Sequence, residues 1–236
     1  MLQSPRTIDT EFDPSFPDTA DVARRTAVVF VLLTLSMAVL GGIGNLAVFD
    51  SSLGAAERDV VAWVADHRTG VLDTAATLGS TLTDTWTVIG VLGGSVAVLI
   101  AIGHTRCAGL MLIGVGLELA VFLVVGAVVD RSRPAVESLH STPSTPSFPS
   151  GHVAAAVVLY GSLVLTLRLV ARPGRFVRGL WVVPAWAAGT VAASRVYEGV
   201  HYPTDVVAGA LLGAGALAGA TLATGIPVRL GEQGPT

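Results

Sequence analysis

Three short polar clusters in this sequence contain the residue types that can bind and cleave a phosphate ester. They lie at residues 131–134, 149–152 and 194–205. Arginine can donate two parallel hydrogen bonds to a phosphate group, and histidine can act as a nucleophile or transfer a proton. The clusters together supply two histidines, an aspartate and several arginines, so they form one candidate anion site if the fold brings them together.

The third cluster places a histidine and an aspartate at a spacing suited to nucleophilic catalysis. Pro203 is typical of the first turn of a helix, so we expect His201 just before a helix and Asp205 in its first turn. A carboxylate there can accept a hydrogen bond from one imidazole nitrogen, which leaves the other nitrogen free as a nucleophile. His152 in the second cluster is another imidazole, which could protonate a leaving group.

The second cluster precedes a long apolar run and is typical of a helix N-terminus that binds an anion. Such an end offers unpaired N–H groups and the positive end of the helix dipole. We expect Ser150 to cap this helix, while Gly151 allows a ligand to approach the backbone closely. Arg133 and Arg195 could each donate two hydrogen bonds to phosphate oxygens.

The same residues have other interpretations at the level of sequence. An isolated arginine at a membrane surface is usually an anchor, and an isolated histidine at the end of an apolar helix is usually a polar cap. His152, His201 and Asp205 could also be three ligands of a metal ion. Because arginines beside these histidines would repel a cation, the pattern favours an anion and predicts no metal ion and no cofactor.

The composition indicates what kind of chain must position these clusters. Of its 236 residues, 52% are apolar and only 13% are charged, which is about half the charge of an average soluble domain. This argues against a soluble enzyme and a disordered chain, and the net charge of −3 gives no basic surface for nucleic acid. The single cysteine, Cys107, excludes an intramolecular disulfide.

Long apolar runs predict an all-α polytopic membrane protein with six transmembrane helices in one bundle. A helix needs roughly 20 apolar residues to cross a bilayer. The candidate spans are residues 26–49, 85–103, 107–129, 151–171, 179–194 and 206–228. With both termini in the cytoplasm, every polar cluster falls at a span end on the outer face, although the clusters played no part in choosing the spans.

The remaining segments complete the expected organisation. Residues 1–23 are polar and acidic and predict a disordered cytoplasmic tail, and residues 230–236 predict a short second one, on either side of a membrane domain at 24–229. Residues 51–84 mix charged and apolar side chains, which suits either amphipathic helices at the outer interface or a simple connecting loop. The cytoplasmic flanks of this arrangement hold more arginines than the outer flanks, as the positive-inside rule requires.

Taken in order, the three clusters resemble the signature of the type-2 phosphatidic acid phosphatase family, whose superfamily includes haloperoxidases. That signature is Lys, six residues and Arg-Pro, then Pro-Ser-Gly-His, then Ser-Arg, five residues, His, three residues and Asp. The second motif is complete at residues 149–152, and the third is complete at Ser194, Arg195, His201 and Asp205. The first is partial, because Gly126 stands at the lysine position.

The resemblance implies a role for each matched residue. His201 would attack phosphorus to form a phosphohistidine, and Asp205 would orient His201. His152 would act as general acid on the leaving group, and then as general base when water hydrolyses the intermediate. The groups that would hold the phosphoryl oxygens are Arg133, Arg195, Ser150, Ser194 and the backbone at Gly151. Arg131 lies near enough in the sequence to compensate for the missing lysine, whose loss otherwise predicts a weaker or differently tuned enzyme.

The implied function is that of a metal-independent membrane phosphatase acting on a lipid phosphomonoester or diphosphate. A polyprenyl diphosphate and a phosphatidate both fit a site at head-group level. Phosphotransfer to another acceptor and a non-catalytic lipid-binding or lipid-translocating role are the alternatives, and Gly126 favours the latter. The expected setting is a bacterial plasma membrane with the site facing outside, the bilayer and a lipid phosphate as partners, and no obligate protein partner. Glu118 lies in mid-span, where an ionisable residue is either functional or packed in protonated form.

Overall fold

The computed structural model describes residues 17–141, 144–170 and 179–226, and this part of the chain is a helical bundle with no β-strand. Its helices are α1 (Thr19–Ile43), α2 (Ser52–Asp66), α3 (Gly70–Ser80), α4 (Thr85–Ala101), α5 (Thr105–Val129), α6 (Gly151–Val170), α8 (Val182–Tyr197) and α9 (Pro203–Thr224). A π-helical turn (Gly44–Val48) extends α1, and a 3-10 turn (Thr81–Thr83) joins α3 to α4. The prediction of an all-helical chain is confirmed for the described residues. Most of the tail predicted at 1–23 and all of the tail predicted at 230–236 lie outside them.

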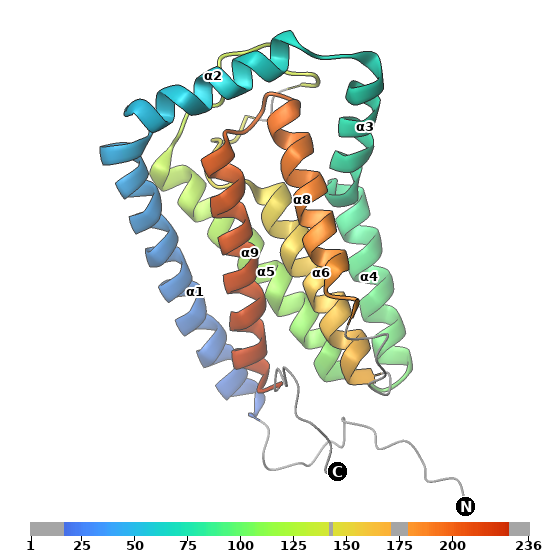
Figure 1. Cartoon of the computed structure of the whole chain (residues 1–236). Helices are drawn as coiled ribbons and strands as arrows, with labels where there is room; N and C mark the ends of the chain where they lie inside the picture. Colours follow the sequence, from blue (N-terminus) through green and yellow to red (C-terminus); the bar gives the residue numbers. More distant parts are fainter. Residues whose placement is uncertain (1–16, 142–143, 171–178, 227–236) are drawn as a thin grey trace, which may run out of the picture.

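The helices α5, α6 and α9 form the centre of the bundle and pack on one another (Figure 1). Around them, α1 packs on α5 and α9, α4 on α5, and α8 on α6. Helix α2 lies across one end, which we call the head of the bundle (Figure 1). The start of α1 and the end of α9 both lie at the opposite end.

Within the described residues, each of the six predicted apolar runs is mostly helical, but fewer qualify as membrane spans on their own. Among the described residues, four helices are long and apolar enough to cross a bilayer: Thr19–Val48, Thr105–Val129, Gly151–Val170 and Pro203–Thr224. The pair formed by Gly70–Thr83 and Thr85–Ala101 qualifies only jointly, because it is bent by 41°. Helix α8 has 16 residues and measures roughly 24 Å, which is shorter than a typical hydrocarbon core. The structure therefore supports four or five candidate spans.

The segment between α1 and α4 divides into two helices with different positions. Helix α2 crosses the head of the bundle, whereas α3 runs beside α8 (Figure 1). The reason is that Ala76, Gly79 and Ser80 form a buried face of α3. A side chain at Gly79 would overlap the hydroxyl of Ser194 on α8, so glycine permits the close approach of the two helices.

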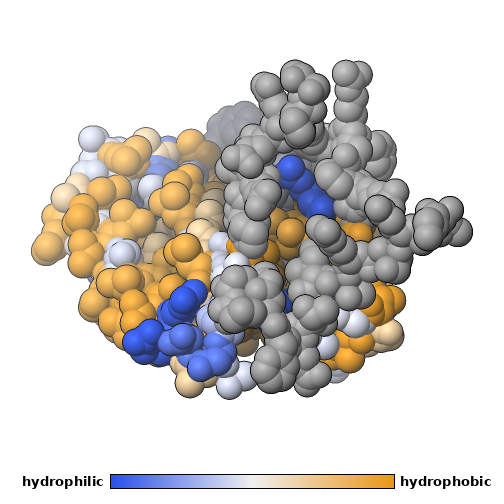
Figure 2. Space-filling view, turned by 90° about the horizontal axis from the view of Figure 1, so that it is seen from below, coloured by the Kyte–Doolittle hydropathy of each residue, from blue (hydrophilic) through white to orange (hydrophobic). Residues whose placement is uncertain are grey.

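The outer faces of the helices are apolar, as expected for a chain in lipid. On α1, Leu32, Leu35 and Val39 are each 58–61% exposed. Viewed from the end opposite the head, much of the visible described surface is hydrophobic (Figure 2). Large apolar side chains on the outside of a bundle mark a membrane or protein contact, and the span-length helices favour a membrane.

The contact between α9 and α6 predicts a strong effect of a small substitution. A Cβ atom at Gly209 would overlap the backbone carbonyl of Ser150, which cannot move without displacing the start of α6. We expect Gly209→Ala to lower the free energy of unfolding by about 2 kcal/mol, measured by denaturant titration in detergent micelles. Gly90→Ala is the matched control, because no atom lies within 4 Å of a Cβ there. Equal stability of the two variants would contradict this contact.

Candidate active site

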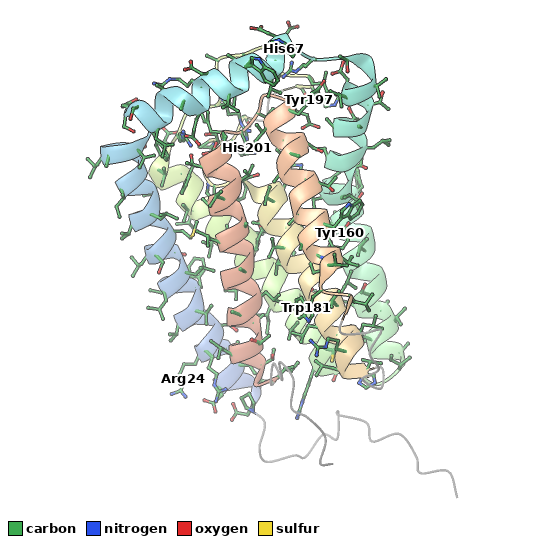
Figure 3. All side chains as sticks on the ribbon, in the orientation of Figure 1. Arg24, His67, Tyr160, Trp181, Tyr197 and His201 are labelled. Atoms are coloured by element: carbon green, nitrogen blue, oxygen red, sulfur yellow. The ribbon has the colours of Figure 1, made fainter. Side chains whose placement is uncertain are left out.

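The three polar clusters meet at one cavity near the head of the bundle. The cavity has a volume of about 470 Å³ and is lined by residues of α4, α5, α6 and α8 and of the connecting loops. Five predicted site residues line it: Arg133, Gly151, His152, Arg195 and His201. Figure 3 shows His201 at the head end, beneath α2. The fold thus gathers side chains from separate segments of the chain.

The cavity has two chemically different regions. Its polar region contains the two arginines and the two histidines, with Thr83, Thr85 and Thr145 beside them. Its apolar region extends between the helices, where the lining residues other than Glu118 are hydrophobic: Val88, Ile89 and Leu92 of α4, and Val115, Leu119 and Phe122 of α5. The sequence clusters did not single out the three threonines: Thr83 and Thr85 adjoin the start of α4, and Thr145 lies between α5 and α6.

His201 is held by a backbone carbonyl rather than by the predicted carboxylate. Its Nδ1 lies 2.8 Å from the carbonyl oxygen of Ser147, and 3.8 Å from Oδ2 of Asp205. Because a carbonyl only accepts, Nδ1 must carry the proton, which leaves Nε2 unprotonated. The expected direct hydrogen bond from His201 to Asp205 is therefore not formed in this structure. Asp205 acts on the ring through its charge.

Burial sets the ionisation of His201. The residue is 2% exposed, and burial is the main cause that lowers its pKa below the usual value. Asp205 opposes this effect, while the positive charges of Arg133 and Arg195 reinforce it. The imidazole is therefore neutral at pH 7, the form that a nucleophile requires.

Arg195 is fixed on one side and has unpaired donors on the other. Its Nη1 lies 2.8 Å from Oε2 of Glu198 and 3.0 Å from Oγ of Ser80. Its Nε is buried and makes no hydrogen bond within the described residues, and neither does the buried hydroxyl of Thr83. Buried donors are normally paired, so these two suit an anionic ligand. The motif analysis missed both partners. Glu198 lies three residues after Arg195, a spacing visible in the sequence, whereas Ser80 meets Arg195 only through the packing of α3 on α8.

Arg133 ties the loop after α5 to the segment before α9. Its guanidinium donates to the carbonyl oxygens of Thr145, Pro146 and Val200 and to the Thr145 hydroxyl, at 2.7–3.3 Å. Burial, and then the nearby charge of Arg195, lower the pKa of Arg133 to about 10. It stays charged at neutral pH, and the two neighbouring cations would be stabilised by a bound anion.

His152 has a carboxylate neighbour that the sequence did not indicate. Its Nε2 lies 3.8 Å from Oδ1 of Asp84, which directly precedes α4. The side chain of His152 is 31% exposed and that of Asp84 is 50% exposed. This separation is too long for a hydrogen bond, so the two side chains are close neighbours without direct contact.

The two motif serines lie behind the cavity lining. Ser150 accepts the first backbone hydrogen bond of α6 from Ala154, but its buried hydroxyl has no hydrogen-bond partner in the described stretches of the chain. The expected capping hydrogen bond is therefore absent there, and the hydroxyl is an unpaired donor beside Gly151. Ser194 is 4% exposed and faces Gly79 of α3.

Arg131 and Asp205 belong to a buried ionic cluster outside the cavity lining. The guanidinium of Arg131 lies 3.0 Å from Oε2 of Glu57 and 2.5 Å from Oδ1 of Asp205. It also stacks between the rings of Phe49 and Tyr202, at 3.6 and 4.2 Å from their centroids. The guanidinium of Arg131 thus pairs with two buried carboxylates and does not line the cavity, where it was predicted to bind phosphate.

The backbone at the start of α9 and helix α2 join the same cluster. Oε1 of Glu57 accepts the N–H of Thr204 at 2.5 Å, and Oδ2 of Asp205 accepts the N–H of Tyr202 at 2.9 Å. These contacts fix the residues on either side of Pro203, where α9 begins as predicted. Glu57 was not found from the sequence because its partners lie far along the chain.

Gly126, at the position of the family lysine, is buried in α5. A Cβ atom there would lie 3.8 Å from the carbonyl oxygen of Phe148, which is an ordinary contact. The expectation that Arg131 compensates for the missing lysine is not supported, since its guanidinium is held by Glu57 and Asp205. Among the described residues that line the cavity, the cations are Arg133 and Arg195.

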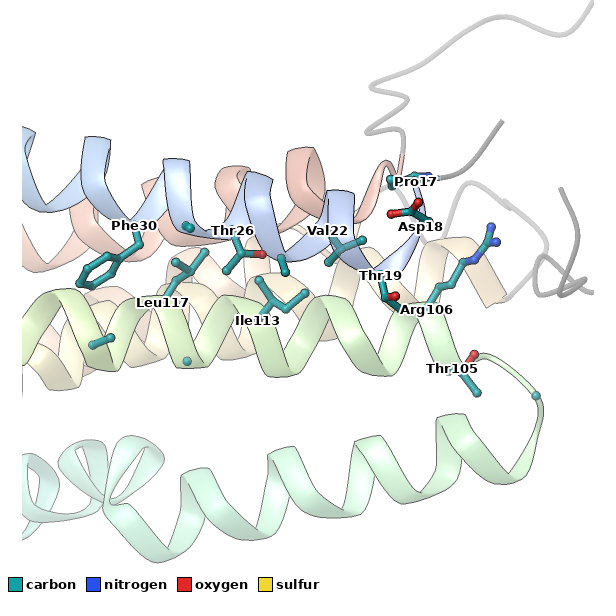
Figure 4. Close-up of a pocket in the computed structure, with 15 residues that line it drawn as sticks. Pro17, Asp18, Thr19, Val22, Thr26, Phe30, Thr105, Arg106, Ile113 and Leu117 are labelled. Atoms are coloured by element: carbon teal, nitrogen blue, oxygen red, sulfur yellow. The ribbon is translucent and has the colours of Figure 1, made fainter. Parts of the chain in front are cut away.

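A larger cavity of about 1150 Å³ lies near the opposite end of the bundle, between α1 and α5 (Figure 4). Its lining is mostly apolar, with Asp18, Thr19 and Arg106 at one end. None of the three clusters contributes to it. Separately, no group of three or more His, Cys, Asp or Glu side chains within the described residues is arranged to hold a metal ion.

Known proteins are similar in sequence to the region that forms most of the cavity. The sequence profile of the PAP2 superfamily matches residues 108–226. An undecaprenyl-diphosphatase from Sulfolobus acidocaldarius is 33% identical over 126 residues, which are 50% of this chain and 55% of that protein. A decaprenylphosphoryl-5-phosphoribose phosphatase from Mycolicibacterium smegmatis is 35% identical over 99 residues, 41% of this chain and 48% of that protein. The chain thus spans about half the length of these relatives.

The fold has a solved counterpart. The PAP2 type phosphatidylglycerolphosphate phosphatase from Bacillus subtilis superposes with a TM-score of 0.71 at 22% identity, over 87% of this chain and 98% of that one. At this identity the likeness establishes the fold alone. The sequence profile covers half of the chain and includes all of the residues that line the polar region of the cavity on α6, α8 and the loops around them. On this evidence the chain is a member of the PAP2 superfamily.

Proposed function

We propose that this protein is an integral membrane phosphatase that removes a phosphate group from a lipid phosphomonoester or diphosphate. The observation that carries the proposal is the division of one cavity into a cationic region and an apolar region. A lipid phosphate has the same division, with its charge at one end and its hydrocarbon at the other. The names of the relatives, which refer to undecaprenyl diphosphate and a decaprenyl-linked phosphoribose, agree with this class of substrate.

The reaction would proceed through a phosphohistidine. The Nε2 lone pair of His201 attacks phosphorus, a P–N bond forms, and the bond from phosphorus to the leaving oxygen breaks. His152, which lies near Asp84, would donate a proton to that oxygen. Water then attacks the phosphohistidine, His152 accepts a proton from the water, and phosphate leaves as the P–N bond breaks.

The surrounding groups would stabilise the charge that develops on the phosphoryl oxygens. Arg195 offers its unpaired Nε, and Gly151 presents its backbone at the start of α6. Arg133 adds charge while its hydrogen bonds keep the loop in place. Ser150 and Ser194 support these groups from behind, and Arg131 holds Asp205. No metal ion takes part in this scheme.

The proposed arrangement in the membrane has six spans with both termini in the cytoplasm and the site at the outer face. The start of α1 and the end of α9 lie at the same end of the bundle, opposite the site (Figure 1), as an even number of crossings requires. The bent α3–α4 pair and the short α8 would supply the two crossings that do not qualify by length alone. The excess of arginine at the cytoplasmic flanks gives the orientation.

Phosphate release from purified protein in detergent tests the proposed function. The substrates are a polyprenyl diphosphate, a phosphatidate and a phosphatidylglycerol phosphate, each assayed with and without EDTA. We expect release that EDTA does not abolish. Loss of release with EDTA would overturn the metal-independent mechanism, and no release from any of these lipids by folded protein would overturn the assignment as a phosphatase.

The lowered pKa of His201 predicts activity that persists into acid. A free imidazole titrates near 6.5, and burial moves the pKa of His201 below this value. The neutral nucleophile therefore remains available as the pH falls through 6.5, and is lost only at a lower pH. In the pH profile of kcat/KM, we expect the acid limb that belongs to the enzyme to lie below pH 6.5. The ionisation of the substrate is measured separately, so that its own contribution to the profile is recognised. A limb at or above 6.5 would contradict the burial of this residue.

A further inference from the structure

The apolar region of the active-site cavity contains one ionisable side chain that the proposed mechanism does not use. Glu118 lines this cavity and is 4% exposed. Within the described residues its carboxyl group makes no hydrogen bond or ion pair, whereas most buried polar side chains have a partner. A carboxyl in this position is costly to bury, so its presence points to a ligand group that it contacts.

The depth of Glu118 follows from the packing of α5 on α6, which run in opposite directions. A Cβ atom at Gly151 would lie 3.1 Å from the ring of Phe122, and one at Gly114 would lie 3.1 Å from Val158. Glu118 is midway between Phe122 and Gly114 on α5, so it faces the level of Ala155 on α6. This level is about one helical turn below His152, or roughly 5 Å. The carboxyl therefore lies just beyond the phosphate-binding region, at the start of the apolar region.

A substrate held by its phosphate would present its linker at this level. The linker joins the phosphate to the hydrocarbon tail, and a hydroxyl on the carbon next to the phosphorylated carbon is four covalent bonds from phosphorus. A carboxyl group accepts a hydrogen bond from a hydroxyl in either protonation state. A polyprenyl diphosphate offers its second phosphate and then hydrocarbon here, with no hydroxyl on carbon, and a phosphatidate offers only esterified oxygens.

We propose that Glu118 forms a linker-binding subsite, which accepts a hydrogen bond from a hydroxyl group of the substrate beside its phosphate. The protein would thus prefer lipid phosphates with a free hydroxyl on the linker, such as a glycerol or sugar hydroxyl, over those without one. This inference rests on the proposed phosphatase function, because it assumes that the phosphate occupies the cationic region of the cavity.

A pair of substrates that differ by one oxygen tests the subsite. The first is a 1-acylglycerol 3-phosphate with its free 2-hydroxyl, and the second is the 2-deoxy compound with the same acyl chain. We expect wild-type kcat/KM to be about 10- to 100-fold higher for the hydroxylated lipid. A ratio near one for wild-type protein would overturn the proposal. If either lipid is hydrolysed, the phosphatase assignment stands even when the ratio is near one. Failure of the subsite proposal is therefore distinguishable from failure of the proposed function.

Variants of Glu118 assign the preference to this residue. In Glu118→Leu the ratio should fall to about one, mainly through loss of activity on the hydroxylated lipid, whereas Glu118→Gln keeps an acceptor and should keep some of the preference. Val115→Ala is the matched control, since Val115 lines the same apolar region about a helical turn deeper and its loss should leave the ratio unchanged. An unchanged ratio in Glu118→Leu would overturn the proposal.

Direct binding keeps the test independent of turnover. The thermal unfolding temperature of wild-type protein is measured with each lipid of the pair. We expect the hydroxylated lipid to stabilise wild-type protein more than the deoxy lipid, and Glu118→Leu to respond equally to both. Equal stabilisation of wild-type protein by the two lipids would count against the subsite.

Discussion

Replacement of His201 by alanine is expected to reduce phosphate release by about 10⁴-fold or more, because the proposed covalent step loses its nucleophile. The Nδ1 contact with Ser147 fixes this ring with Nε2 unprotonated, and alanine supplies no replacement for that nitrogen. The measurement is steady-state release from the preferred lipid. A substrate labelled on the transferred phosphate adds a second measurement, because wild-type protein should carry the label after alkaline quench and the variant should not.

His67→Ala is the control for this substitution. His67 is exposed at the end of α2, where its ring stacks on Trp63 at 4.4 Å between centroids, and it does not line the active-site cavity. We expect its variant to release phosphate at the wild-type rate and to carry the label. Substantial activity in His201→Ala would show that another group attacks phosphorus.

Replacement of Arg131 by methionine is expected to lower the free energy of unfolding by about 3–5 kcal/mol, the usual cost of removing one partner of a buried ion pair. The side chains of Glu57 and Asp205 are 4% and 0% exposed, so the two carboxylates would remain buried and close together without their counter-charge. The backbone hydrogen bonds around Pro203 depend on the same carboxylates. Denaturant titration in detergent micelles measures the loss.

An exposed arginine provides the matched control. Arg24 pairs with Asp21 at 2.9 Å, but their side chains are 75% and 42% exposed, so Arg24→Met should cost less than about 1 kcal/mol. Adding Glu57→Gln to Arg131→Met should recover some of the lost stability, since it removes one of the two unpaired charges. If Arg131→Met were no less stable than Arg24→Met, the buried ionic cluster would contribute no more to stability than an exposed ion pair.

The sequence was sufficient for those features that depend on short-range patterns. Apolar length predicts helices whatever their neighbours, and each of the six predicted runs is mostly helical over its described residues. Pro203 predicted the start of α9, with His201 before it and Asp205 in its first turn. The motifs also singled out five residues that line one cavity.

Other features required the folded structure because they depend on contacts between distant segments. Arg131 was expected to bind phosphate, yet it is held by Glu57, which is 74 residues away. Asp205 was expected to accept a hydrogen bond from His201, but it accepts from Arg131 and Tyr202 instead. The charge and hydrogen-bonding capacity of a residue are visible in the sequence, whereas the partner that uses them is not.

The sequence by itself determined a helical membrane chain of the PAP2 type and the chemical groups of its site. Only the tertiary structure decided that Asp84 approaches His152, that α3 descends beside α8, and that Glu118 lies about one helical turn below His152 in the cavity. Hydropathy and motif spacing act along the chain over a few helical turns. Helix packing sets the depth and direction of each side chain, and it depends on small residues such as Gly79 and Gly151 that let particular faces meet.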